Sequence, residues 1–139
     1  MLAHLRCLLL GRTYDQIRNS ICYPNLNVKI CASHSGVTVG EDGATHQMIE
    51  DLNLMRGLPN MTVMCTSDDT ETKWAVREIS KIKGPVYLRL GRLNSPLVYE
   101  KSPVFEIGKG VQIGERNRCY YFCNRYNCTR GNSCKRRIR

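Results

Sequence analysis

The sequence predicts an α/β domain of three layers (α/β/α), with helices on both faces of a short parallel sheet. Three apolar segments of strand length, at residues 26–32, 61–65 and 86–90, alternate with segments of helical periodicity. Such alternation is typical of parallel strands joined by right-handed crossovers. The 139 residues suffice for one domain with a modest core, but not for a complete multidomain enzyme.

The first predicted helix covers residues 13–21, where side chains recur at helical spacing: Tyr14, Ile17, Arg18 and Ile21. Pro24 ends this helix, because the residue before a proline avoids the helical region of backbone conformation. The apolar residues 26–32 have the length and the β-branching of a strand. This first strand runs directly into a long polar loop.

The loop at residues 33–47 carries most of the chemistry of the chain. Gly36, Gly40 and Gly43 permit positive φ angles and a close approach to a ligand. Open α/β sheets bind ligands where a strand passes into a helix. The loop also holds two imidazoles and two adjacent carboxylates, which makes it the predicted ligand site: His34, Glu41, Asp42 and His46.

A second helix is predicted over residues 45–56, with Gly57 as its C-terminal cap and Pro59 just beyond. One face of this helix is apolar: Met48, Ile49, Leu52 and Met55. We expect that face to lie in the core. The run 61–65 that follows is expected to be a strand buried on both faces.

A third helix is predicted after this strand, with Asp68 and Glu71 spaced as an N-cap and its partner. Its apolar positions recur at helical spacing: Trp74, Ala75, Ile79 and Ile82. Gly84 and Pro85 stop the helix before the last strand.

The last predicted strand, residues 86–90, is followed closely by Arg92. Arg89 alternates away from Arg92 along the strand, so we expect Arg89 to be a solvated or packing residue. Beyond residue 93 the periodicity fades among prolines and glycines. Residues 94–114 are therefore expected to be an interdomain linker.

The positive charge of the chain is concentrated at its C-terminal end. Of the formal charge of +9, residues 115–139 contribute +7, with eight Lys or Arg residues and one acid. The body is nearly neutral, so its charge gives no reason to expect nucleic-acid binding there. No apolar run is long enough to span a membrane, and residues 1–10 lack a secretory cleavage pattern, which predicts a cytoplasmic protein.

Six segments of the chain occur in the order in which transketolases have them: GRTYDQIRNSI, VGEDGATHQ, Pro59-Asn60-Met61, SDDTE, GPVYLRLGR and FEIGKG. From about residue 11 to 114 the chain resembles the pyrimidine-binding domain of that family. It is most similar to the separately encoded C-terminal section of split transketolases. Deoxyxylulose-phosphate synthase and the β subunits of oxo-acid dehydrogenases share this domain and stay open as alternatives. The resemblance implies a transferase of the pentose phosphate pathway that uses thiamine diphosphate.

The resemblance also implies roles for particular residues. His34 and His46 match family histidines that line the substrate channel and the thiamine diphosphate site, and both are candidate catalytic residues. Asp42 and Arg92 match residues that bind a substrate hydroxyl and the sugar phosphate, with His34 beside them. Gly40 and Glu41 are placed at the cofactor with His46, although Glu41 is alternatively a structural or interface residue. No residue is assigned to a metal.

Two parts of the family's machinery have no counterpart here. The glutamate that activates the cofactor lies upstream of anything in this chain, and another domain holds the diphosphate with its Mg²⁺ or Ca²⁺. We therefore expect a chain that is inactive alone and pairs with a transketolase N-terminal section, in a homodimer or heterotetramer that takes sugar phosphates. Neither nucleic acid nor a membrane is an expected partner.

The two ends depart from the family pattern. Permitted codons for residues 1–11 and 118–138, read in a shifted frame, encode family-like segments, so both ends are interpreted as frameshifted translation. The expected organisation is an aberrant segment at 1–10, a partial pyrimidine-binding domain at 11–93, the linker, and an irregular basic tail at 115–139. The rival interpretation of the tail is a metal- or nucleic-acid-binding module built on Cys119, Cys123, Cys128 and Cys134.

Overall fold

The computed structural model describes residues 1–99 and 104–111. The chain divides into two compact units. The first unit consists of Met1–Cys65 with Val76–Asn94, and the second of Thr66–Ala75 with the chain from Ser95 onward. The predicted basic tail lies outside the described residues, as does the end of the predicted linker.

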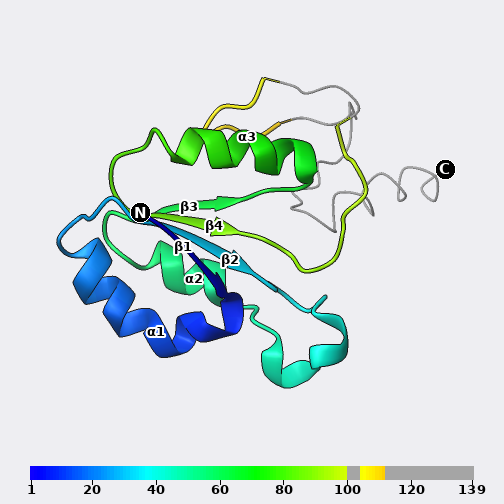
Figure 1. Ribbon diagram of the computed structural model, residues 1–139, viewed down its shortest axis with the longest axis horizontal. Helices are drawn as coiled ribbons and strands as arrows, with labels where there is room; N and C mark the ends of the chain where they lie inside the picture. Colours follow the sequence, from blue (N-terminus) through cyan, green and yellow to red (C-terminus); the bar gives the residue numbers. More distant parts are fainter. Residues whose placement is uncertain (100–103, 112–139) are drawn as a thin grey trace, which may run out of the picture. The chain divides into compact units, whose positions relative to one another are not determined.

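Four parallel strands form one sheet in the first unit (Figure 1). The strands are β1 (Leu2–Arg6), β2 (Lys29–Ser33), β3 (Thr62–Cys65) and β4 (Val86–Arg89), and their order across the sheet is β1-β2-β4-β3. The sheet and its helices confirm the predicted α/β class. The first residues of the four strands lie next to one another across the sheet. Lys29 pairs with Leu2 on one side and with Val86 on the other, and Val86 also pairs with Thr62.

Strand β1 was not predicted, because no element was expected in residues 1–10. Met1 reinforces its pairing with β2, since its carbonyl accepts the Lys29 amide at 2.9 Å. A 3₁₀ turn, Cys7–Leu9, then leads into the first helix. The shifted-frame origin of this segment concerns the gene, so it stays a prediction for the nucleotide sequence to test.

The first helix is longer than predicted. Helix α1 (Leu10–Ile17) continues as a π-helical turn, Arg18–Cys22, so the helical stretch begins before residue 13 and ends after residue 21. Leu10, Ile17 and Cys22 are buried along it. The hydrophobic face therefore includes Leu10, which the sequence placed in the aberrant segment.

The second helix is shorter than predicted. Helix α2 (Asp51–Arg56) begins six residues later than expected, after 3₁₀ turns at Gly40–Asp42 and Ala44–His46. Met48 is not helical, because its carbonyl accepts the Gly36 amide at 2.7 Å in an isolated antiparallel bridge. Met48 and Met55 are buried as expected, whereas Ile49 is 68% exposed and does not belong to the core.

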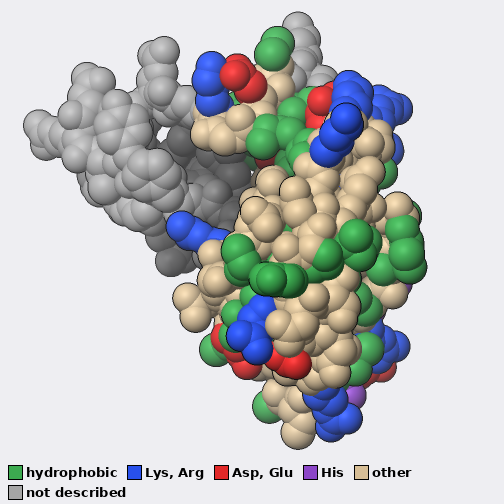
Figure 2. Space-filling model, turned by 90° about the vertical axis from the view of Figure 1, so that its left-hand side faces the viewer, with side chains coloured by type: hydrophobic (Ala, Val, Ile, Leu, Met, Phe, Trp, Pro, Cys, Tyr) green, Lys and Arg blue, Asp and Glu red, His purple; other side chains and the backbone are tan. Residues whose placement is uncertain are grey.

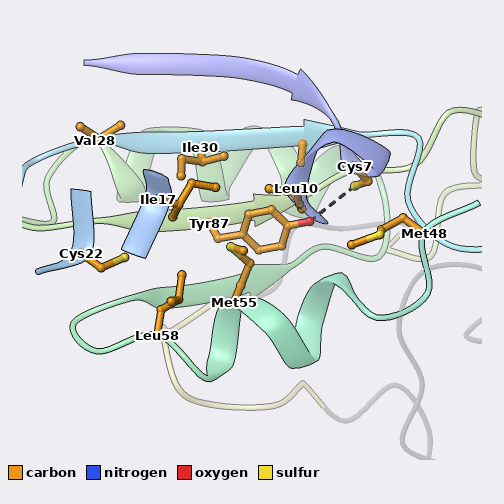
Figure 3. Close-up of a cluster of buried hydrophobic side chains, with 11 residues drawn as sticks. Cys7, Leu10, Ile17, Cys22, Val28, Ile30, Met48, Met55, Leu58 and Tyr87 are labelled. Atoms are coloured by element: carbon orange, nitrogen blue, oxygen red, sulfur yellow. Dashed lines mark hydrogen bonds between the residues drawn. The ribbon is translucent and has the colours of Figure 1, made fainter. Parts of the chain in front are cut away.

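The core of the first unit surrounds Tyr87 of β4 (Figure 3). Its ring is fully buried, and the side chains that surround it come from α1, α2 and the segments next to them: Leu10, Ile17, Cys22, Met48, Met55 and Leu58. The two helices contact each other and lie on the same side of the sheet (Figure 1). Strand β3 is half-buried rather than buried on both faces, because it lies at one edge of the sheet.

A buried lysine, Lys29, stabilises the sheet at the amino-terminal end of β2. The Lys29 ammonium donates to the carbonyls of Ile82 and Gly84, at 2.7 and 2.6 Å, and to Asn27 Oδ1 at 2.6 Å. Lys29 is only 6% exposed, and this burial lowers its pKa. Three acceptors satisfy its three N–H donors, which is why a charge can be buried here.

The second unit is organised by Asp68. Its carboxylate accepts the Glu71 amide at 2.9 Å, as predicted for the N-cap of helix α3 (Asp69–Ile79). The other carboxylate oxygen accepts the amides of Val98 and Tyr99, so part of the predicted linker is attached to the helix start. The rings of Tyr99 and Trp74 lie 5.0 and 5.2 Å from that of Phe105, measured between centroids.

Hydrophobic side chains also reach the surface, between charged groups, on the face drawn in Figure 2. Among the described residues of the first unit, the large hydrophobic side chains with the greatest exposure are Met1, Leu2, Tyr23, Val37 and Ile49. Across residues 1–99 and 104–111, none of the helices combines the length and apolar character needed to traverse a lipid bilayer.

Candidate functional site

The candidate site lies at the carboxyl ends of β2 and β4, which are adjacent in the sheet. His34 directly follows β2, and Arg92 follows β4 by three residues. A hydrogen bond from the Ser35 amide to the Leu90 carbonyl joins the two chain segments at this edge. Ligands of open α/β sheets bind at such strand ends.

An ion pair connects two of the predicted site residues. Arg92 Nη1 lies 3.2 Å from Asp42 Oδ2, and their side chains are 31% and 26% exposed. Arg92 also donates to the carbonyl of Val39, so its guanidinium lies against the start of the 3₁₀ turn Gly40–Asp42. A Cβ at Gly40 would lie 3.4 Å from Arg92 Nη1, and Gly40 has φ +75°. Glycine therefore permits both the turn and the approach of the arginine.

His34 has an unusual backbone for a residue with a side chain. Its φ is +64°, in the left-handed region that few non-glycine residues adopt. Its Nδ1 is 2.9 Å from the Ser33 hydroxyl. Burial and the positive charges of Arg6 and Arg92 lower the pKa of His34. The imidazole is therefore held in its neutral form near neutral pH, in which one ring nitrogen accepts and the other donates.

The other predicted residues are less closely connected. His46 is half-buried in the 3₁₀ turn Ala44–His46, and its Nδ1 is 3.0 Å from the Thr45 hydroxyl. Gly40 and Glu41 are exposed. The structure thus brings Asp42 and Arg92 into contact, and both act on the pKa of His34, while no hydrogen bond within the described residues links His46 to them.

A buried polar network lies beneath the loop and was not predicted. Asp51 is fully buried, and its carboxylate accepts two hydrogen bonds from the Arg89 guanidinium and one from the Tyr87 hydroxyl. Arg89 is therefore neither solvated nor a simple packing residue, since its side chain is 14% exposed and ion-paired. The signal in the sequence was a carboxylate within the apolar face between Met48 and Met55.

The network has clear electrostatic consequences. Burial raises the pKa of Tyr87 far above its ordinary value, and nearby Cys7 and Asp51 raise it further. Burial also raises the pKa of the Cys7 thiol to about 11, although the hydroxyl of Tyr87 lies 3.4 Å from its sulfur. Burial lowers the pKa of Arg89, but the hydrogen bonds and the negative charge of Asp51 raise it by more, so the pKa of Arg89 lies above its ordinary value. Tyr87 and Cys7 therefore keep their protons, and the charge of Asp51 is matched by Arg89.

The arrangement can bind an anionic, hydroxylated ligand. A guanidinium suits a phosphate, a carboxylate accepts hydrogen bonds from hydroxyl groups, and an imidazole can donate and accept hydrogen bonds. A Cβ at Gly43 would meet no atom within 4 Å, so the backbone there is open to a ligand. Within residues 1–99 and 104–111 no cluster of three or more His, Cys, Asp or Glu side chains is placed to hold a metal ion.

Comparisons with known proteins show which family the chain is similar to. Residues 5–97 match the family model "Transketolase, pyrimidine binding domain". A protein of Methanocaldococcus jannaschii, named for the C-terminal section of transketolase, is 52% identical over 102 residues, which cover 72% of this chain and 32% of the relative. Human transketolase is 35% identical over 102 residues, covering 73% of this chain and 16% of the enzyme.

Solved structures give the same result. A split-gene transketolase, described as an inactive β4 tetramer, has a TM-score of 0.72 and 47% identity, with 82% of this chain and 36% of that chain covered. A Pichia stipitis transketolase in complex with sedoheptulose 7-phosphate has a TM-score of 0.65 and 28% identity, with 73% and 15% covered. The chain therefore spans about a third or less of the length of these relatives.

Proposed function

Because the chain belongs to the transketolase family, through its pyrimidine-binding domain, we propose that it supplies part of the thiamine diphosphate and sugar-phosphate site for ketol transfer. The contact between Arg92 and Asp42 carries this proposal. It joins the end of β4 to the loop after β2, at the edge of the sheet where ligands bind.

Each side chain has a distinct task in the proposed site. Arg92 binds the substrate phosphate, and its release from Asp42 leaves that carboxylate free to accept a substrate hydroxyl. His34, whose pKa both charges affect, would hydrogen-bond the same substrate. The bound cofactor supplies the electron sink for the substrate carbanion. The imidazoles of His34 and His46 would hold or move a proton there.

The cofactor contact is proposed for the other end of the loop. His46, Gly40 and Glu41 would face the aminopyrimidine ring, which needs hydrogen-bonding groups and close backbone approach. A transketolase N-terminal section, or an equivalent domain, would hold the diphosphate with Mg²⁺ or Ca²⁺. The chain would then be inactive alone, in a complex that completes the site as a homodimer or heterotetramer.

The test is reconstitution with a transketolase N-terminal section, thiamine diphosphate and Mg²⁺, followed by an assay of glycolaldehyde transfer. We expect transfer in the mixture and none from either chain alone. Arg92→Ala should raise the KM for a phosphorylated ketose by about 10- to 100-fold, as expected for loss of a charged hydrogen bond, and should leave the KM for an unphosphorylated donor unchanged.

Arg56→Ala is the matched control, because Arg56 is an exposed arginine at the end of α2, outside the proposed site. It should leave both KM values unchanged. No transfer by the wild-type mixture, despite a stable complex of the two chains, would refute the proposed function. Equal effects of Arg92→Ala on phosphorylated and unphosphorylated donors would refute the role of Arg92.

A further inference from the structure

The hydroxyl of Ser33 bridges two imidazoles. Its Oγ is 2.9 Å from Nδ1 of His34 and 3.1 Å from Nε2 of His4. The register of β1 and β2 explains the contact, since His4 pairs with Cys31 and Arg6 pairs with Ser33. Side chains alternate between the faces of a sheet, so His4 and Ser33 lie on the same face, one step apart. The bridge therefore depends on the pairing of the edge strand.

The bridge restricts where the protons can be. A serine hydroxyl has one hydrogen to donate, while its oxygen can accept from another donor. Ser33 can thus donate to only one of the two ring nitrogens that it contacts. When both rings are neutral, one of His4 Nε2 and His34 Nδ1 carries a hydrogen and the other is bare. The tautomer of His34 is then tied to that of His4.

The groups around His34 favour its neutral form, so its tautomer decides which ring nitrogen can accept a proton. Burial, Arg6, Arg92 and His4 lower the pKa of His34, and only Asp42 raises it among the charged groups that act on it. The left-handed backbone of His34 persists only if neighbouring contacts hold it, and the Ser33 bridge is one such contact. The ring is thus neutral and fixed on its Nδ1 side, with Nε2 as its second proton site.

We propose that Ser33 and His4 are positioning residues, which set the tautomer of His34 through the hydroxyl bridge and exchange a proton with it. Before the transfer, His34 carries its hydrogen on Nδ1 and donates it to Ser33. The hydroxyl hydrogen of Ser33 points to His4 Nε2. Nε2 of His34 then accepts a proton from a ligand. The role in catalysis rests on the proposed function, whereas the coupling itself does not.

The transfer balances without any further reactant. As a proton binds His34 Nε2, the Nδ1–H bond breaks and its hydrogen moves to Ser33 Oγ. The hydroxyl hydrogen of Ser33 moves to His4 Nε2. His34 is left neutral with its hydrogen on Nε2, and His4 becomes an imidazolium. His4 is exposed, so it returns the proton to water.

The test is ¹⁵N NMR on the full chain with labelled histidine, because the sequence has three histidines and their ring signals report both tautomer and titration. In the unmodified chain, His4 and His34 should show coupled titration curves. His4→Gln should change the tautomer ratio of His34 and move its apparent pKa by about half a pH unit or more. Ser33→Ala should change both rings, and Ser33→Thr should restore them.

Thr45→Val is the matched control, because it removes the hydroxyl that contacts Nδ1 of His46 and leaves the Ser33 bridge intact. It should change the ring signals of His46 alone. Independent titration of His4 and His34 in the unmodified chain would overturn the proposal, as would a His34 tautomer ratio that His4→Gln leaves unchanged.

The reconstituted enzyme separates the two proposals. His4→Gln should retain transfer activity but shift the acidic limb of the pH profile of kcat/KM. Coupled titration in a chain that supports no transfer with any N-terminal section would refute the proposed function and leave the coupling in place. Transfer that depends on Arg92, together with uncoupled histidines, would refute the coupling alone.

Discussion

Asp51 and Arg89, which are 38 residues apart in the sequence, form a buried ion pair between the first residue of α2 and the last residue of β4. Arg89 Nε donates to Oδ2 of Asp51 at 2.8 Å, and a second guanidinium nitrogen donates to Oδ1 at 3.1 Å. A Cβ at Gly36 would lie 3.5 Å from the same guanidinium, so the pair lies close to the loop after β2. The pair therefore ties the helix, the strand and the candidate site together.

Removing one partner of this pair should destabilise the fold strongly. Asp51→Leu leaves the Arg89 charge buried without its carboxylate, and we expect a loss of about 3–5 kcal/mol in the free energy of unfolding. The measurement is urea denaturation followed by circular dichroism. Lys73→Ala, which breaks an exposed pair with Asp69, is the control and should cost about 0–1 kcal/mol. Equal losses for the two variants would contradict this account of the pair.

Lys29→Met should destabilise the sheet at the amino-terminal end of β2. The substitution keeps the apolar stem, but it leaves the carbonyls of Ile82 and Gly84 without their donor. Unsatisfied buried acceptors cost about 1–3 kcal/mol, and the urea midpoint should fall accordingly. Lys81→Met changes an exposed lysine paired with Glu78 and should leave the midpoint nearly unchanged. A stable Lys29→Met variant would show that the ammonium contributes nothing to folding.

The same glycine-to-alanine change should have opposite effects at two positions. Gly43 has φ +74° and ψ −175°, a conformation almost restricted to glycine, so Gly43→Ala should cost about 1–3 kcal/mol. Gly11 lies inside α1, and a Cβ there would meet no atom within 4 Å. Gly11→Ala should therefore stabilise the chain by about 0.5–1 kcal/mol. Thermal unfolding should therefore show a lower melting temperature for Gly43→Ala and a higher one for Gly11→Ala than for the unmodified chain.

Stability should depend on pH through His34. Burial, Arg6 and Arg92 lower its pKa in the folded state, so the unfolded chain takes up the proton first as the pH falls. The stabilisation is present above the ordinary imidazole pKa of about 6.5 and is lost as the pH falls through the lower folded value. The urea midpoint should drop less between about pH 7.5 and about pH 5.5 in His34→Gln than in the unmodified chain.

Arg6→Gln provides an independent check on this pH dependence. It removes one of the positive charges that lower the pKa of His34 but keeps the histidine. The acid-induced drop in the urea midpoint should then lie between those of the unmodified chain and His34→Gln. A drop identical to that of the unmodified chain would exclude Arg6 as a cause.

The fold class and part of the site could be predicted because they depend on local patterns. The strands at 61–65 and 86–90 were visible as apolar runs between turn residues, and β3 and β4 lie there. Parallel strands of one sheet share a carboxyl edge, so the loop after β2 and Arg92 after β4 could be placed together. The ion pair of Asp42 with Arg92 bears out that placement.

The remaining features depend on contacts between distant residues. Strand β1 has no β-branched residue to indicate a strand, and it exists because β2 offers an edge for pairing. The start of α2 was placed too early because Met48 is buried by its bridge to Gly36 rather than by a helical turn. The partners of Asp51 and His4 likewise become neighbours only when the sheet has formed.

Among the described residues, three buried thiols can report local unfolding of the chain. Cys7 and Cys22 are fully buried at either end of the first helical stretch, and Cys31 is buried within β2. With a pKa of about 11, the buried Cys7 thiol offers almost no thiolate at neutral pH, so its alkylation requires local opening. Pulse alkylation read by peptide mass spectrometry would then show whether α1 detaches before the sheet separates.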